Sequence, residues 1–351
     1  GALAIVLNFE DIAGNTGTAL SQADLDGINV VFDNTAPNIT TAGIVSSNAT
    51  STLAKVGDVI TLSVVSEEDL YSITAAQIAG QNVAALNITE TDARNWSFTY
   101  TMLNTDTEGV ITFTFTANDL AGNGTTVTTA TSGSVMFDKT APTLSTVEIV
   151  SNNANTSYAK TLNVVTLTIA SDEDLIAAPT VLLAGRATTV AATAGGTALR
   201  DYTATITMNS TDTQGAMAIS IAFSDIYGND GTIVTATTNS SSVTFDREIP
   251  TLGTVTYASN NADPDDYAKE GDIITITILA DENLMSTATG GTDPVATIAT
   301  AAATETGSNL NWSASYTMQS GDTEGDIPFT IDFFDIAGNA GVQRTTLSAG
   351  D

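Results

Sequence analysis

The chain has 351 residues, of which 40 are Asp or Glu, 9 are Lys or Arg and none is His or Cys, so its formal net charge is −31. This balance excludes nucleic-acid binding as a main function and makes anionic lipid surfaces poor partners, because both need clustered basic side chains. Without His or Cys there are no disulfides, thiol nucleophiles, His-based triads or zinc sites of the usual Cys/His kind. No run approaches the 18 apolar residues that membrane insertion of this segment would need.

In chain order, the first organising feature is a repeated phrase. Asp-Ile-Ala-Gly-Asn begins at Asp11, and near-copies begin at Asp119, Asp225 and Asp335, at intervals of about 107 residues. Each of the first three copies is followed by a Phe-Asp pair and a Pro, and each later stretch carries an Ala-Lys pair, an acidic triplet and an aromatic residue six positions before a Met. A repeat of this length is a domain, because solenoid units are shorter.

Within each repeat, apolar residues alternate with Thr and Ser, as in 59–65, 164–169 and 273–278, which is typical of half-buried strands. For the repeat at 142–250 we predict strands at 145–150, 163–170, 180–184, 187–192, 200–208 and 216–224, and a last strand ending at Phe245. About seven short strands in about 100 residues indicate an immunoglobulin-like β-sandwich. The predicted fold class is therefore all-β, with tandem immunoglobulin-like β-sandwich domains in a linear array. Trp96, Tyr202 and Trp312 are expected to fill the cores.

The positions of the repeated phrases along the chain predict the domain boundaries. Residues 1–35 are the C-terminal strands of a partial domain, 36–141 and 142–250 are complete domains, and 251–351 is a domain that lacks its last strand. Two interpretations of these ends compete: a window of a longer array, or a filament subunit whose missing strand comes from a neighbour by strand addition. The segment 28–33 could fill such a gap. We favour the window, because residues 1–15 duplicate a strand that a donor would not need.

The phrase Asp-x-Ala-Gly-Asn, followed by Phe-Asp and Thr-Ala-Pro, resembles the tandem bacterial Ig-like domains of giant surface adhesins and those of some S-layer proteins. The motif residues are Asp11, Gly14, Asn15, Asp33 and Pro37, with their later counterparts. The resemblance implies an extracellular, cell-surface protein, and Ca²⁺ between domains that stiffens the array. The chain departs from the pattern at 246–250, where Arg and Glu replace the usual small residues.

Sandwich topology predicts that acidic residues converge where successive domains meet. In the repeat at 142–250, strands B, C and F are the predicted strands 163–170, 180–184 and 216–224, and strand G ends at Phe245. The B–C and F–G loops lie at the end of a domain where the preceding domain's last strand arrives. Each junction should therefore collect a linker Asp, an acidic triplet and the Asp and Asn of the repeated phrase. The first junction would gather Asp33, Glu67, Glu68, Asp69, Asp119 and Asn123. The second would gather Asp138, Asp172, Glu173, Asp174, Asp225 and Asn229. The third would gather Asp246, Asp281, Glu282, Asn283, Asp335 and Asn339. In each triplet we expect two of the three side chains to face the junction.

Crowded carboxylates need a counter-charge, and Ca²⁺ takes six to eight oxygen ligands of these kinds, so the sequence predicts interdomain Ca²⁺. The alternative is turn chemistry, in which Asp and Asn bond their own backbone. We expect a non-catalytic structural segment of a cell-surface array, either an S-layer or an adhesin stalk. Its partners would be neighbouring copies or domains of the same surface protein and divalent cations. A carbohydrate- or receptor-binding module is less favoured because only 6% of residues are aromatic. An enzyme is disfavoured because a catalytic carboxylate pair should occur once, not in every repeat.

Overall fold

The computed structural model describes residues 6–24, 30–262 and 266–348. Internal contacts divide the chain into two units. The first comprises Gly1–Thr140 with Tyr227–Asn229, and the second comprises Ala141–Ile226 with Asp230–Asp351. The described residues form β-strands and the short 3₁₀ helices η1 (Gln22–Asp24), η2 (Ala85–Asn87) and η3 (Thr287–Thr289). None of the helices in the described part of the chain is long and apolar enough to cross a membrane.

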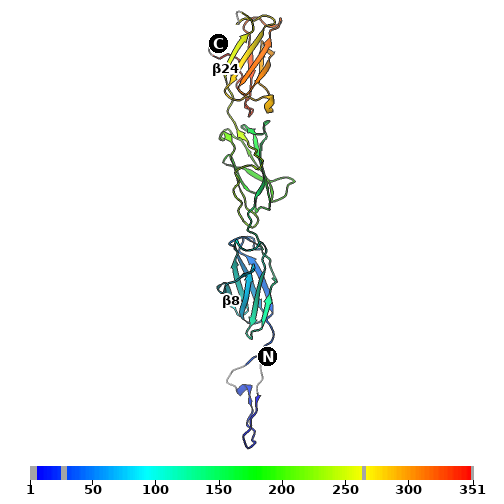
Figure 1. The fold of residues 1–351 in the computed structure, drawn as a ribbon, viewed down its shortest axis with the longest axis vertical. Coiled ribbons are helices and arrows are strands. Elements are labelled where there is room, and N and C mark those ends of the chain that lie inside the picture. The colour runs from blue at the N-terminus through cyan, green and yellow to red at the C-terminus, as the bar shows by residue number, and fades with distance from the viewer. Residues whose placement is uncertain (1–5, 25–29, 263–265, 349–351) are drawn as a thin grey trace. The chain divides into compact units, whose positions relative to one another are not determined.

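The first unit begins with a short antiparallel pair and continues into a sandwich, in which Figure 1 labels β8. The pair is β1 (Val6–Leu7) with β2 (Leu20–Ser21). One layer of the sandwich has the order β3 (Ile39–Ser46), β5 (Val59–Ser66), β9 (Asn95–Thr101), β8 (Ile88–Asp92). A second sheet has the order β12 (Gly124–Val127), β11 (Phe113–Asp119), β6 (Leu70–Ile78), β7 (Gln81–Asn82). A third has the order β10 (Gly109–Val110), β13 (Met136–Phe137), β4 (Leu53–Ala54), with β13 parallel to β4.

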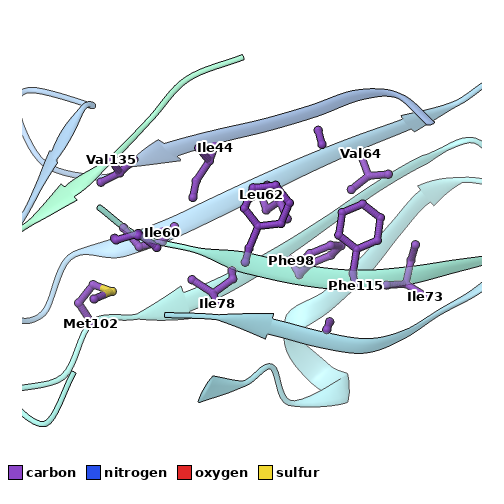
Figure 2. Packing of buried hydrophobic residues seen from close by; sticks show 14 of the residues in the cluster. Ile44, Ile60, Leu62, Val64, Ile73, Ile78, Phe98, Met102, Phe115 and Val135 are labelled. Atoms are coloured by element: carbon purple, nitrogen blue, oxygen red, sulfur yellow. The ribbon is translucent and has the colours of Figure 1, made fainter. Parts of the chain in front are cut away.

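The alternation read from the sequence builds the core of this sandwich. Along β5, Ile60, Leu62 and Val64 are buried, while the Thr and Ser residues between them face outward. Figure 2 shows these side chains packed with Phe98 and Phe115, whose rings meet edge to face with centroids 5.2 Å apart. Burial of this apolar surface is the main stabilising contribution to the sandwich.

The second unit holds two further hydrophobic clusters with the same plan. Around the first cluster, one sheet has the order β14 (Leu144–Ser151), β16 (Val164–Ser171), β20 (Asp201–Thr207), β19 (Thr189–Ala192). It faces β18 (Arg186–Ala187), β17 (Thr180–Leu183), β22 (Ile219–Ala222) and the set β15 (Tyr158–Ala159), β23 (Thr244–Phe245), β21 (Gly215–Ala216). Around the second cluster lie β24 (Leu252–Ser259), β25 (Ile273–Ala280), β29 (Asn311–Thr317), β28 (Thr304–Ser308) and the set β27 (Ala301–Ala302), β26 (Val295–Ile298), β30 (Phe329–Asp332).

The predicted fold class is confirmed, and most predicted strands lie within a residue or two of observed ones. The strand predicted at 216–224 is divided, because β21 pairs with β23 whereas β22 pairs with β17, so the chain changes sheets between them. Tyr202 and Trp312 are buried in their cores, and Trp96 is half-buried against its own. The domain boundaries stay a prediction, as does the strand-donor segment 28–33, of which residues 28 and 29 lie outside the described residues.

Candidate metal centre

Three carboxylates from distant parts of the sequence meet in the first unit. Asp33 lies in the segment before β3, Glu68 lies in the loop between β5 and β6, and Asp119 ends β11. One oxygen from each of the three lies within 4.8 Å of the others. The loop after β5 and the corner after β11 thus bring their acids close to Asp33, which leads into the sandwich. We call Asp33, Glu68 and Asp119 the first triad.

Asp119 is buried and held by its own turn. Its Oδ1 accepts hydrogen bonds from the backbone N–H groups of Ala121 and Asn123, both at 2.8 Å, and its Oδ2 accepts one from Asn123 Nδ2 at 2.8 Å. The same Nδ2 donates to the backbone oxygen of Asp33 at 3.3 Å. The bonds from Asn123 lower the pKa of Asp119, so this carboxylate stays ionised. Asn123 therefore orients the Asp and ties the turn to the incoming linker.

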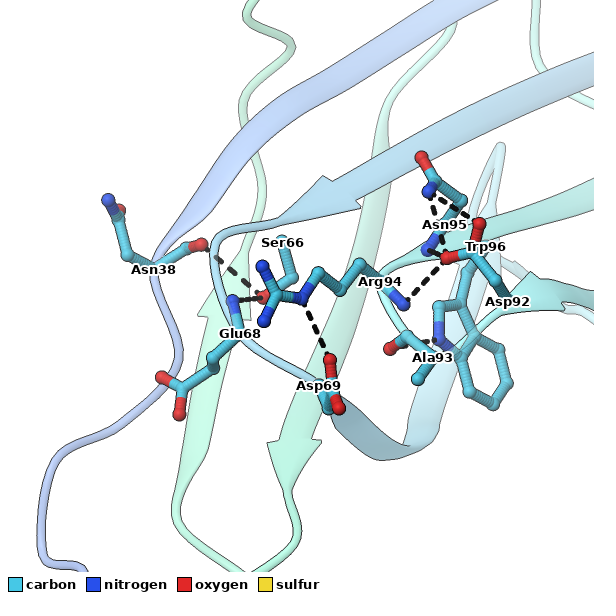
Figure 3. A network of polar contacts seen from close by, with 9 residues as sticks. All are labelled: Asn38, Ser66, Glu68, Asp69, Asp92, Ala93, Arg94, Asn95 and Trp96. Atoms are coloured by element: carbon cyan, nitrogen blue, oxygen red, sulfur yellow. Dashed lines mark hydrogen bonds and ion pairs between the residues drawn. The ribbon is translucent and has the colours of Figure 1, made fainter.

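Glu68 is the member of its acidic triplet that joins the triad. Figure 3 shows its carboxylate pointing away from Arg94, whose Nε is bonded to Asp69 Oδ1 at 2.8 Å. The backbone N–H of Glu68 donates to Ser66 Oγ at 3.3 Å, which fixes the start of the loop. Burial raises the pKa of Glu68, and the negative charges of Asp33 and Asp119 raise it further. The ionised form of Glu68 is therefore disfavoured at this position unless a cation is bound there.

The second unit contains an equivalent group. One oxygen each from Asp246, Glu282 and Asp335 lies within 4.8 Å of the others, and we call these residues the third triad. Asp335 is buried and accepts bonds from Asn339 through its backbone N–H at 2.8 Å and its Nδ2 at 2.7 Å. Asn339 Nδ2 also donates to the backbone oxygen of Asp246 at 3.2 Å. The contacts of Asn123 in the first unit are thus repeated here.

The third triad shows the cost of crowding acids most clearly. Burial raises the pKa of Glu282 to about 7, and the charges of Asp335 and Asp246 add to that shift. Burial also raises the pKa of Asp335, against the opposing effect of its bonds from Asn339. A divalent cation bound by these oxygens would remove the repulsion.

The middle set predicted from the sequence is divided between the units. Asp138 follows β13 in the first unit, where Asn229 Nδ2 donates to its backbone oxygen at 3.4 Å. Glu173 and Asp225 belong to the second unit, and a carboxylate oxygen of one lies within 4.8 Å of an oxygen of the other. Asp225 is fully buried. The residue types and their positions relative to the strands match those of the two triads.

The other members of the triplets have different partners. Asp172 accepts bonds from the backbone and hydroxyl of Thr143, at 2.8 and 2.7 Å, and Asp281 accepts one from the Thr251 hydroxyl. Asp174 forms an ion pair with Arg200 at 2.6 Å, as Asp69 does with Arg94. The remaining two, Glu67 and Asn283, are exposed. The middle residue of each triplet is the one whose carboxylate lies in an acidic group, and that two of the three side chains face the junction stays a prediction.

Each triad suits a hard cation such as Ca²⁺. Three carboxylates offer up to six oxygens, and carboxylates with backbone oxygens are the ligands that Ca²⁺ prefers. Mg²⁺ demands a tighter octahedron and usually keeps several waters, so the ligand chemistry favours Ca²⁺. Arg94 is bonded to Asp69 of the same loop, and its charge lowers the pKa of Glu68 without cancelling the effects of burial and of the neighbouring acids.

No family model matches the chain, and no curated protein matches its sequence. Several solved structures are similar. A 1.5-MDa bacterial ice-binding adhesin, studied for its retention at the host cell surface, is 17% identical with a TM-score of 0.46, over 89% of this chain and 97% of that one. A Ca²⁺-stabilised adhesin with which an Antarctic bacterium binds ice is 21% identical with a TM-score of 0.45, over 98% and 80%. The I9–I11 tandem of titin is 10% identical with a TM-score of 0.32, over 84% and 94%.

Sequence reasoning missed the basic residues that act beside the acids. Arg247 departs from the family pattern, yet it occupies the position of Lys139 one repeat earlier. Lys139 Nζ donates to the backbone oxygens of Asn104 and Asp106, at 2.9 and 2.8 Å, and Arg247 Nη1 donates to that of Ser210. Both bases anchor a linker to the turn that precedes it. The signal was available, because both follow the Phe-Asp pair directly.

Proposed function

We propose that this chain is a non-catalytic structural segment of an extracellular cell-surface array, in which Ca²⁺ bound by the acidic triads stiffens the joints between immunoglobulin-like sandwiches. The observation that carries the proposal is the repeated triad: a linker Asp, the middle residue of a B–C triplet and a buried Asp held by an Asn. An S-layer and an adhesin stalk are both arrays of this kind. A filament joined by strand donation is the second arrangement to test.

The mechanism follows from the origin of the ligands. In the third triad, Asp246 comes from the segment before β24, whereas Glu282 and Asp335 come from two loops of the sandwich that follows. An ion shared by these three side chains would fix the linker to the loops and replace mutual repulsion by attraction. Sequence equivalence alone extends the proposal to Asp138, Glu173 and Asp225 at the middle joint.

Repetition also argues for a structural task. A catalytic pair of carboxylates works in a unique cleft, whereas these acids recur with the same Asn partner and the same strand context. Their recurrence is expected of a structural site that is needed at each connection between successive domains. The excess of 40 acidic over 9 basic residues also means that close packing of neighbouring copies would be favoured by divalent cations.

Calcium titration by isothermal calorimetry tests the proposal on the whole chain after chelation. We expect saturable binding of Ca²⁺ that Mg²⁺ at the same concentration does not reproduce, and loss of one site when Asp246→Asn and Glu282→Gln are combined. The control is Glu324→Gln, which removes one exposed acid from a turn outside the triads. Absence of saturable binding to the parent chain, or an unchanged number of sites in the double variant, would contradict the proposal.

A further inference from the structure

A second set of contacts reaches the turn that carries Asp335, and it involves no carboxylate. In the second unit, Asn153 Nδ2 donates to the backbone oxygen of Ala337 at 2.7 Å, and Lys160 Nζ donates to that of Gly338. Asn153 follows β14 and Lys160 follows β15, so both come from the sandwich that precedes the turn. We call this pair of side chains and the two carbonyls they bond the Asn–Lys clasp.

The same clasp occurs in the first unit. Asn48 Nδ2 donates to the backbone oxygen of Tyr227 at 3.0 Å, and Lys55 Nζ donates to that of Gly228. Tyr227 and Gly228 belong to this unit. The donors occupy identical positions in their repeats: each Asn lies two residues after a buried Ser that ends a strand, and each Lys follows the Ala of a two-residue strand.

The donors are held in place by their own loops. The backbone N–H of Lys160 donates to Asn163 Oδ1 at 2.8 Å, and that of Asn153 donates to Ser151 Oγ at 3.1 Å. Both side chains are half-buried. These bonds fix the backbone from which the two side chains extend, and the half-burial of each side chain reduces the freedom that it loses when it bonds.

The linker is also tied to the sandwich that it leaves. The backbone N–H groups of Arg247 and Glu248 both donate to Gln214 Oε1, at 2.9 and 3.0 Å, and the Arg247 guanidinium donates to Ser210 O. These bonds orient the segment 246–248, which contributes Asp246 to the third triad. In the second unit, the segment 246–248 is thus bonded to the sandwich before it, and the turn at 337–338 is bonded by the clasp. All of these bonds end on uncharged oxygen atoms.

We propose that the Asn–Lys clasp is a metal-independent fastener that keeps successive sandwiches in register when no cation is bound. The groups that accept in the bound turns are backbone carbonyls, so removal of Ca²⁺ takes away none of them. In the first unit, Asn48 Nδ2 also donates to Asp58 Oδ2 of its own sandwich at 2.8 Å. Hydrogen bonds from a charged donor are also stronger than neutral ones. This role goes beyond the proposed function and holds whether or not the triads bind an ion.

Spin-label distance measurements on the whole chain in chelator test the clasp. The chain has no Cys, so Thr168→Cys and Thr277→Cys, both at exposed strand positions, place one label on each sandwich of the second unit. We expect a single narrow distance distribution for this labelled parent. We expect that distribution to be lost when Asn153→Ala and Lys160→Met are added. Lys269→Met is the matched control, because it removes the lysine at the same position of the next repeat, and the narrow distribution should persist.

Two results would overturn the inference: a broad distribution for the labelled parent in chelator, or an unchanged narrow distribution in the clasp variant. Denaturation followed by Trp312 fluorescence verifies that the last core remains folded in each variant. Adding Ca²⁺ separates this inference from the proposed function. If Ca²⁺ fails to narrow the distribution of the clasp variant, the metal proposal is contradicted while the result in chelator still decides the clasp.

Discussion

Glu282→Gln should change the stability of the last core in opposite directions with and without Ca²⁺. The substitution keeps the shape of the side chain and removes one of the three charges in the third triad. At 4.8 Å two unit charges repel by about 1 kcal/mol in water and by about 3.5 kcal/mol at an effective dielectric constant of about 20. Glu282 is half-buried, so the water value is a lower limit for each pair, and two such pairs are removed. In chelator we expect the free energy of unfolding to rise by at least about 2 kcal/mol.

In Ca²⁺ the same change removes a ligand. Saturation at about 1,000 times the dissociation constant would stabilise the native joint by about 4 kcal/mol. A tenfold loss of affinity would remove about 1.4 kcal/mol of that stabilisation. The gain from relieved repulsion no longer applies, because the ion already neutralises the triad. The variant should therefore be less stable than the parent when Ca²⁺ is present.

The assay is urea denaturation at pH 8, above the pKa of about 7 for Glu282, with Trp312 as the reporter. The background substitution Trp96→Phe leaves Trp312 as the remaining one of the chain's two tryptophans. Glu324→Gln, an equal change of charge at an exposed site, is the control. The reasoning is refuted if Glu282→Gln shifts stability in the same direction in both conditions, or if the control gives the same pair of shifts.

Three further predictions concern pH, packing and a buried acid. Because the folded protein raises the pKa of Glu282 from an ordinary 4.5 to about 7, it binds more protons than the unfolded chain in that interval, so stability in chelator should fall as pH rises through it. Gly341→Ala would place a methyl group 2.2 Å from a core phenylalanine ring and should cost about 1–3 kcal/mol, whereas Gly321→Ala, which meets open space, should be nearly neutral. Tyr100→Phe removes a hydroxyl that donates to the buried Asp106 at 3.0 Å and should cost about 1–3 kcal/mol.

Each of these has a direct measurement. The pH effect is read from the urea midpoint of the last core between pH 4.5 and 7 in chelator, and a midpoint that rises over this interval would contradict it. The two glycine variants are compared by the same Trp312 signal, and equal stabilities would show that the ring moves aside freely. The tyrosine variant is followed by Trp96 fluorescence in the first sandwich, with Tyr71→Phe, at an exposed position, as the control.

The sequence was sufficient for the fold because alternation and repetition are properties of the chain itself. Strands such as β5 and β16 lie where Val, Ile and Leu alternate with Thr, and topology correctly brought Asp33 near Glu68 and Asp119. It was not sufficient to choose within a triplet. Which residue of a triplet joins the acidic group depends on partners about 25 residues away. Asp69, for example, is bonded to Arg94, which comes near it only when the hairpin of β8 and β9 has formed.

The linker bases show a different limit. Arg247 departs from the small residues that the resemblance implies after a Phe-Asp pair, although Lys139 occupies the same position one repeat earlier. Its role became visible only when the carbonyl of Ser210, which belongs to a separate turn, was placed beside it. Acceptors on the main chain leave no trace in a sequence, so donors that use them are hard to recognise beforehand.

The Asn–Lys clasp binds main-chain oxygens, and this has an evolutionary consequence. The residue whose oxygen accepts from the Asn is Tyr227 in one turn and Ala337 in the other, and both contacts are made at 3.0 Å or less. Mutations that alter the side chain of the accepting turn therefore leave the fastener intact. The proposed clasp would therefore tolerate divergence in the side chains of the turns that it binds.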